Sequence, residues 1–69
     1  MRVEKLFELR TKHGYTNREM GEKLGISRVY YGYLESGQRK VSYQMAINIS
    51  KVFGLKPDAI FYEYQKNKS

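Results

Sequence analysis

The side chains best suited to contact a polyanion lie between positions 16 and 40 of this 69-residue chain. This stretch carries arginines, lysines, hydroxyls and amides, the groups that bind phosphates and the edges of bases. Arg28, for example, could donate two hydrogen bonds to a guanine. The chain has no cysteine, and His13 is its only histidine. We recognise no acid–base pair, nucleotide loop or metal cluster, so the sequence predicts neither an enzyme nor a cofactor or metal site.

The charge of the chain favours the same class of partner. Thirteen Lys and Arg stand against seven Asp and Glu, which gives a formal net charge of +6. Such a balance favours nucleic acid first and an anionic membrane surface second, although a merely basic domain would share it. No apolar run approaches the ~20 residues of a membrane span, and charges interrupt residues 1–14 too often for a signal peptide. We expect a cytoplasmic protein with no membrane association and no small-molecule ligand.

The side chains between positions 16 and 40 must be positioned by helices, because apolar residues recur along the chain at helical spacing. The pattern predicts an all-α fold, a compact five-helix bundle with helices at about 2–13, 17–24, 28–36, 43–53 and 57–64. One domain covers 1–64, and 65–69 form a frayed basic tail. Thr16 and Glu19 have the spacing of a capping box at the start of the second helix. Gly25 is expected to close the turn before the third helix in a left-handed conformation.

The second and third helices are predicted to form a helix-turn-helix. Gly21 lies inside the second helix, where glycine is costly, and therefore indicates a close crossing with no room for a Cβ. Tyr31 and Leu34 form the apolar stripe of the third helix. The outer face of that helix displays four residues that can enter a major groove: Arg28, Val29, Gly32 and Tyr33.

Seven tyrosines could suggest stacking platforms for single-stranded nucleic acid. They are scattered over several helices, however. Tyr15, Tyr31 and Tyr43 coincide with apolar positions, and we expect these three in the core or between helices.

From Leu6 to Phe61 the chain resembles the phage Cro/CI-like (XRE-type) helix-turn-helix repressors. The residues that carry the resemblance are Leu9, Arg10, Thr16, Met20, Gly21, Leu24 to Ser27, Leu34 to Gly37, Ser42, Ile49 to Gly54 and Asp58 to Phe61. It implies a lambda-repressor-like bundle that binds double-stranded DNA. The chain departs from the family pattern at Gly21 (usually alanine), at Tyr31 (usually isoleucine or valine) and at the Gly32-Tyr33 pair (usually polar).

The resemblance also implies roles for individual residues. Arg10 and Glu35 are expected to form an ion pair between the first and third helices, the alternative being two unrelated surface charges. The start of the third helix is expected in the major groove, with base contacts from Arg28, Val29, Gly32 and Tyr33. Phosphate contacts are expected from Asn17, Arg18, Ser27, Tyr30, Ser36, Arg39 and Lys40. Arg39 or Lys40 could instead reach the minor groove.

One such module offers little contact area, so we expect a homodimer on a palindromic operator. The expected interface comprises Leu55, Pro57, Asp58, Phe61, Tyr62 and Tyr64. Alternatively, Ile60 and Phe61 only close the core of the single chain. A repressor is the favoured function, and an antitoxin-like or partner-binding module that also binds DNA is the alternative. Charge-driven binding without sequence preference is a further possibility.

Overall fold

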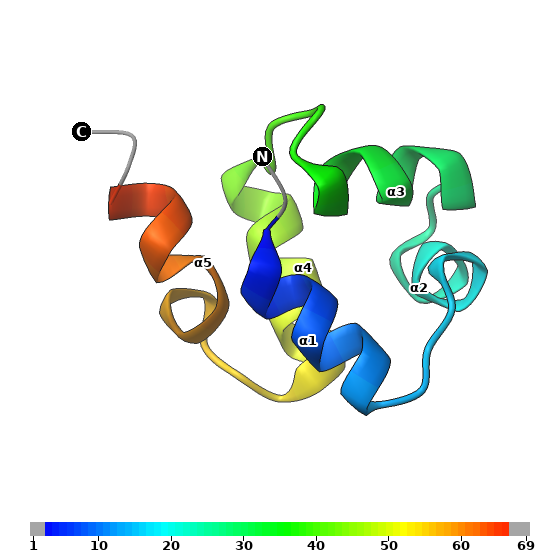
Figure 1. Cartoon of the computed structure of the whole chain (residues 1–69), viewed down its shortest axis with the longest axis horizontal. Helices are drawn as coiled ribbons and strands as arrows, with labels where there is room; N and C mark the ends of the chain where they lie inside the picture. Colours follow the sequence, from blue (N-terminus) through cyan, green and yellow to red (C-terminus); the bar gives the residue numbers. More distant parts are fainter. Residues whose placement is uncertain (1–2, 67–69) are drawn as a thin grey trace.

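The computed structural model describes the backbone of residues 3–66 and the side chains of residues 3–61. Within this part the chain forms five helices and no strand: α1 (Glu4–Lys12), α2 (Asn17–Leu24), α3 (Arg28–Ser36), α4 (Tyr43–Phe53) and α5 (Pro57–Lys66) (Figure 1). The all-α prediction is confirmed, and each bound lies within two residues of the predicted one. Residues 65 and 66 continue α5, and the rest of the predicted tail lies outside the described residues.

Local hydrogen bonds fix the start of α2. The Thr16 hydroxyl accepts the Glu19 backbone N–H at 3.1 Å, and the Glu19 carboxylate accepts the Thr16 backbone N–H at 2.8 Å. The predicted capping box is therefore present. Gly25 ends the helix with φ +74°, a conformation that glycine adopts without a Cβ clash. The chain then enters α3, where the Ser27 hydroxyl accepts the Tyr30 N–H.

The helices α2 and α3 form the most extensive helix pair, and Figure 1 shows α3 along its length with α2 seen end-on beside it. Gly21 lies at their contact. A Cβ placed on Gly21 would stand 2.7 Å from the Ile26 carbonyl oxygen, closer than side chains approach in real structures. The predicted close crossing is confirmed.

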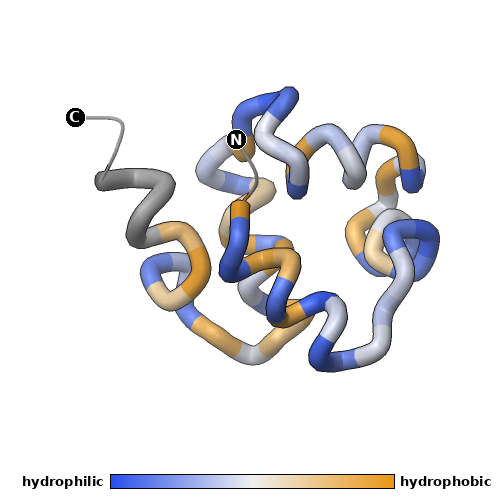
Figure 2. The backbone as a smooth tube through the Cα atoms, in the orientation of Figure 1, coloured by the Kyte–Doolittle hydropathy of each residue, from blue (hydrophilic) through white to orange (hydrophobic). Residues whose placement is uncertain are grey.

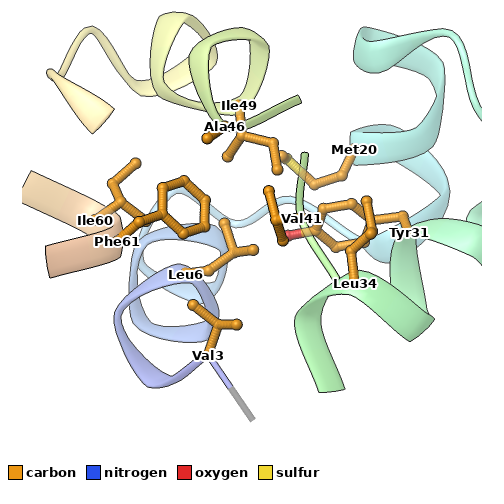
Figure 3. Packing of buried hydrophobic residues seen from close by; sticks show 10 residues of the cluster. All are labelled: Val3, Leu6, Met20, Tyr31, Leu34, Val41, Ala46, Ile49, Ile60 and Phe61. Carbon is orange, nitrogen blue, oxygen red and sulfur yellow. The ribbon is translucent and has the colours of Figure 1, made fainter. Parts of the chain in front are cut away.

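The core lies where α1, α3, α4 and α5 meet, and Figure 3 shows its buried side chains converging from these helices and from α2. Its members are Val3, Leu6, Met20, Tyr31, Leu34, Val41, Ala46, Ile49, Ile60 and Phe61. The hydrophilic stretches, such as the connector between α3 and α4, lie at the periphery (Figure 2). The chain therefore has one core, built by all five helices.

Two expectations about aromatic residues were wrong. Phe61 was assigned to the dimer interface, but its side chain is only 1% exposed because it turns into the core of the single chain, towards α1. Its backbone departs from helical angles (φ −109°, ψ 16°), so α5 is kinked at this point. Tyr43 was expected in the core or between helices but is 76% exposed. It is the first residue of α4, beyond the stretch of that helix that contributes Ala46 and Ile49 to the core.

Candidate nucleic-acid interface

An open groove lies between the N-terminus of α2 and the outer face of α3. Its volume is about 560 Å³, and it is lined by Thr16, Asn17, Arg18, Arg28, Val29, Gly32, Tyr33, Ser36 and Gln38. Seven of these nine residues are predicted DNA contacts, which come from two helices and meet in one place. Thr16 and Gln38 were not predicted. They flank the ends of α2 and α3, and the sequence gives no direct signal that they share a groove.

The outer face of α3 presents its side chains to solvent. Arg28 and Tyr33 are exposed, and Val29 is 55% exposed, although a valine in a well-packed helix is usually buried. This face therefore offers a bidentate donor, an apolar contact and an aromatic ring along one side of the helix. The predicted phosphate contacts Ser27, Tyr30, Arg39 and Lys40 are exposed but do not line the groove.

Asn17 and Gly32 lie against each other across the groove. A Cβ on Gly32 would stand 3.6 Å from the Asn17 amide nitrogen Nδ2. The Asn17 Oδ1 atom is buried and is the one such side-chain atom, among residues the structure describes, with no hydrogen-bond partner. Buried polar atoms without a partner are rare in folded proteins. A Cβ at position 32 would therefore make only an ordinary van der Waals contact with the Asn17 amide, so packing against Asn17 does not require a glycine there.

Arg18 is paired only loosely. Its Nε lies 3.5 Å from a Glu22 carboxylate oxygen one turn along α2, and the two side chains are 77% and 66% exposed. Exposed pairs of this kind contribute little to stability. Arg18 can therefore exchange this partner for a phosphate at small cost.

A buried ion pair lies behind α3, on the side away from the groove. The Arg10 guanidinium donates from Nε to Glu35 Oε1 at 2.8 Å and from Nη2 to Glu35 Oε2 at 3.0 Å. Its third hydrogen bond, from Nη1, reaches the Tyr15 carbonyl at 2.9 Å. The predicted ion pair between α1 and α3 is confirmed. Through its hydrogen bond to the Tyr15 carbonyl, Arg10 also holds the segment that leads from α1 into α2. The hydrogen bonding of Arg10 to the Glu35 carboxylate is the main cause that raises the pKa of Arg10 above its ordinary value.

Tyr31 completes this cluster, which the sequence alone did not show. Its ring is fully buried, and its hydroxyl donates to Glu35 Oε1 at 2.9 Å. Burial, and then the negative charge of Glu35, raise the pKa of Tyr31 well above its ordinary range. The signal was present, because a buried tyrosine needs a partner for its hydroxyl and Glu35 lies one helical turn away. The Val3 N–H also donates to the Glu35 backbone carbonyl, at 2.8 Å.

Residues 6–60 match the family model described as helix-turn-helix. The chain belongs to the XRE-type helix-turn-helix family. This helix-turn-helix protein is similar to the uncharacterized HTH-type transcriptional regulator YgzD of Bacillus subtilis, with 32% identity over 63 residues, which are 91% of this chain and 96% of YgzD. An uncharacterized HTH-type transcriptional regulator of Methanocaldococcus jannaschii is 37% identical over 57 residues, 83% of this chain and 86% of that protein.

A third relative is much longer. A Pyrococcus furiosus protein, named provisionally as an HTH-type transcriptional regulatory protein, is 41% identical over 61 residues, which are 84% of this chain and 19% of that protein. The helix-turn-helix protein thus spans about a fifth of this relative. No solved structure matches the chain. Among the described residues, no helix is long and apolar enough to cross a membrane.

Proposed function

We propose that this helix-turn-helix protein is a transcriptional regulator that binds double-stranded DNA sequence-specifically in the cytoplasm. We further propose that it acts as a repressor, as a homodimer on a palindromic operator. The observation that carries the proposal is the groove between α2 and α3, in which cationic, amide and hydroxyl groups from both helices are gathered on one open face. The names of its relatives, HTH-type transcriptional regulators, support the same function.

In this proposal the first turns of α3 enter the major groove. Arg28 donates two hydrogen bonds to a guanine, and Val29 contacts a thymine methyl group. Gly32 adds no side chain at the centre of the face, so the helix backbone approaches the bases closely. Tyr33, also predicted as a base contact, lies farther along the same groove, with its ring against Arg39.

Phosphate contacts flank this face and fix the position of the protein on the duplex. Asn17 and Arg18 lie at the N-terminus of α2, where unpaired backbone N–H groups and the helix dipole favour an anion. The remaining contacts come from both ends of α3 and from the connector that follows it: Ser27, Tyr30, Ser36, Arg39 and Lys40. The buried Arg10–Glu35 pair supports the proposal because it fixes how α3 presents these groups.

For the dimer we propose that the residues before and at the start of α5 form a two-fold interface. Leu55 is 39% exposed, and Asp58 is exposed beside the partly buried Pro57. Phe61 is excluded because it is buried in its own chain. The side chains of Tyr62 and Tyr64, also predicted here, lie outside the described residues. Light scattering at micromolar concentration is expected to give twice the chain mass, and Leu55→Lys is expected to give the single mass. A wild-type protein that stays monomeric on its operator would refute this interface.

The decisive experiment is selection of bound duplexes from a random pool, followed by competition between the selected site and bulk DNA. We expect a palindromic site that is preferred by about 10³-fold or more. Arg28→Ala is expected to relax preference at one base pair in each half-site, whereas the matched variant Arg39→Ala weakens binding to all sequences evenly. If no sequence is enriched, the proposal of sequence-specific binding fails. If Arg28→Ala leaves the base preferences unchanged, the assignment of Arg28 as a base contact fails.

A further inference from the structure

Tyr33 makes two kinds of contact with the connector that follows α3. Its backbone carbonyl accepts the N–H of Gln38 at 2.9 Å and that of Arg39 at 3.2 Å. Gly37 permits this reversal, with φ +85°. The backbone of Arg39 is therefore fixed by the last turns of α3, although the connector itself lies at the surface.

The ring of Tyr33 contacts the same arginine. The Arg39 guanidinium carbon lies 5.9 Å from the centre of the Tyr33 ring, within the range of a cation–π interaction. Arg39 has no ion-pair partner among the described residues. One residue of α3 thus holds both the backbone and the cation of Arg39 beside the groove.

We propose that Tyr33 is a positioning residue, and that most of its contribution to DNA affinity is exerted through Arg39. This inference rests on the proposed function, in which Arg39 contacts a phosphate. An unrestrained arginine loses rotamer freedom when it binds, and a guanidinium already held against a ring loses less. The Tyr33 ring therefore orients the Arg39 guanidinium in advance for a contact with a DNA phosphate.

The inference separates Tyr33 from Arg28 on the same helix face. Arg28 has no such ring contact or ion pair among the described residues and is exposed to make its own contacts. Replacing Tyr33 should weaken binding to every sequence, because the phosphate contact is common to all duplexes. Replacing Arg28 should change which sequence is preferred.

A double-mutant cycle tests the inference. The variants are Tyr33→Leu, Arg39→Ala and the double variant, titrated with the selected operator and with an unrelated duplex at several salt concentrations. Tyr33→Leu should weaken binding to both duplexes by about two- to five-fold in the wild-type background, the range expected for one exposed cation–π contact. In the Arg39→Ala background the same substitution should change affinity by less than about 1.5-fold.

The salt dependence of DNA binding separates the two roles, because a Tyr33 that only stabilised the fold would leave the contribution of Arg39 to the salt slope unchanged. Arg39→Ala should reduce the slope of log K against log salt by about one, and adding Tyr33→Leu should not reduce it further. Tyr33→Phe is the matched control, because it keeps the ring and should bind as the wild type does. Thermal unfolding of each variant separates loss of folding from loss of affinity.

Three results would overturn the inference: equal losses for Tyr33→Leu in both backgrounds, a loss for Tyr33→Phe as large as that for Tyr33→Leu, or a changed base preference in Tyr33→Leu. Each would mean that Tyr33 contacts DNA directly. Failure of the proposed function gives a different result: the wild type would then bind the operator and the unrelated duplex with equal affinity. The cycle on the unrelated duplex would still decide the role of Tyr33.

Discussion

Replacement of Arg10 by methionine tests how α3, the proposed recognition helix, is held. Methionine keeps much of the apolar stem but removes all three guanidinium hydrogen bonds, two to Glu35 and one to the Tyr15 carbonyl. Glu35 is buried in the wild type, and its carboxylate would keep the Tyr31 hydroxyl as its one side-chain donor among the described residues. We expect Arg10→Met to be strongly destabilising.

The magnitude follows from the burial of the pair. Their side chains are 14% and 9% exposed, so most of the hydration of both charges is lost on folding. Removing one partner of such a pair costs about 3–5 kcal/mol, because the other charge stays buried without compensation. A chain of 69 residues is expected to have only about 3–10 kcal/mol of stability in total. Arg10→Met should therefore unfold at much lower urea concentration and be partly unfolded at 37 °C.

A triple variant serves as the control. Arg10→Met, Tyr31→Phe and Glu35→Leu together remove the cation, the anion and the hydroxyl, and leave an apolar contact between α1 and α3. Replacing a whole buried polar cluster by apolar residues is often neutral or stabilising, so we expect this variant to recover most of the lost stability. Urea unfolding followed by circular dichroism gives the free energies of unfolding of the wild type, Arg10→Met and the triple variant.

The result that would refute the reasoning is a loss below about 1 kcal/mol for Arg10→Met, the range of an exposed ion pair. It would mean that water reaches the Glu35 carboxylate freely. If the triple variant is stable but binds DNA weakly at all sequences, the cluster serves to orient α3 rather than to stabilise the chain. That outcome would support the role we propose for it in DNA binding.

Further predictions concern single groups. Gly32→Ala should stabilise the protein by about 0.5–1 kcal/mol, because its Cβ would make only an ordinary 3.6 Å contact with Asn17, yet it should weaken DNA binding; unchanged affinity in a titration would show that α3 does not approach DNA closely there. Thr16→Ala should lose about 1 kcal/mol in thermal unfolding, since it removes the capping box of α2, and a neutral result would contradict the observed bonds. Tyr31→Phe should cost about 1–2 kcal/mol at pH 7. The folded state raises the pKa of Tyr31, so the Tyr31 hydroxyl loses its proton in the unfolded chain first, as the pH rises above about 10. The free energy of unfolding of the wild type therefore falls above this pH. The difference in stability between the wild type and Tyr31→Phe narrows accordingly. Urea unfolding at pH 7 and above pH 10 measures the gap, and a constant gap would show that burial does not hold this proton.

The elements of the fold were predictable from sequence because they are encoded locally. The capping box at Thr16 and the left-handed Gly25 depend on neighbours within a few residues, and both have the expected geometry. The close crossing at Gly21 was predictable for a related reason, since a costly glycine inside a helix points to a steric demand. The Arg10–Glu35 contact was implied by resemblance rather than by spacing, because these residues lie 25 positions apart.

The errors concern residues whose environment depends on distant parts of the chain. Helical periodicity gives the face on which Tyr43 lies, but it does not show that the core ends before the first turn of α4 is reached. Similarly, the spacing of Phe61 fits an exposed or a buried face, and the kink in α5 turns it inward. The groove residue Gln38 depends on how the connector folds back over α3, which neither composition nor periodicity encodes.

In the proposed function the two faces of α3 have separate tasks, and this separation follows from helical spacing. Arg28, Gly32 and Ser36 repeat every four residues along the groove, whereas Tyr31 and Glu35 repeat with the same spacing on the buried side. Substitutions on the groove side are therefore free to change which bases are read with little effect on folding. Substitutions on the buried side should change stability and lower affinity for all sequences together. Because Tyr31 takes a place usually held by an aliphatic residue, its hydroxyl adds a hydrogen bond to the buried side of α3 and leaves the groove side unaltered.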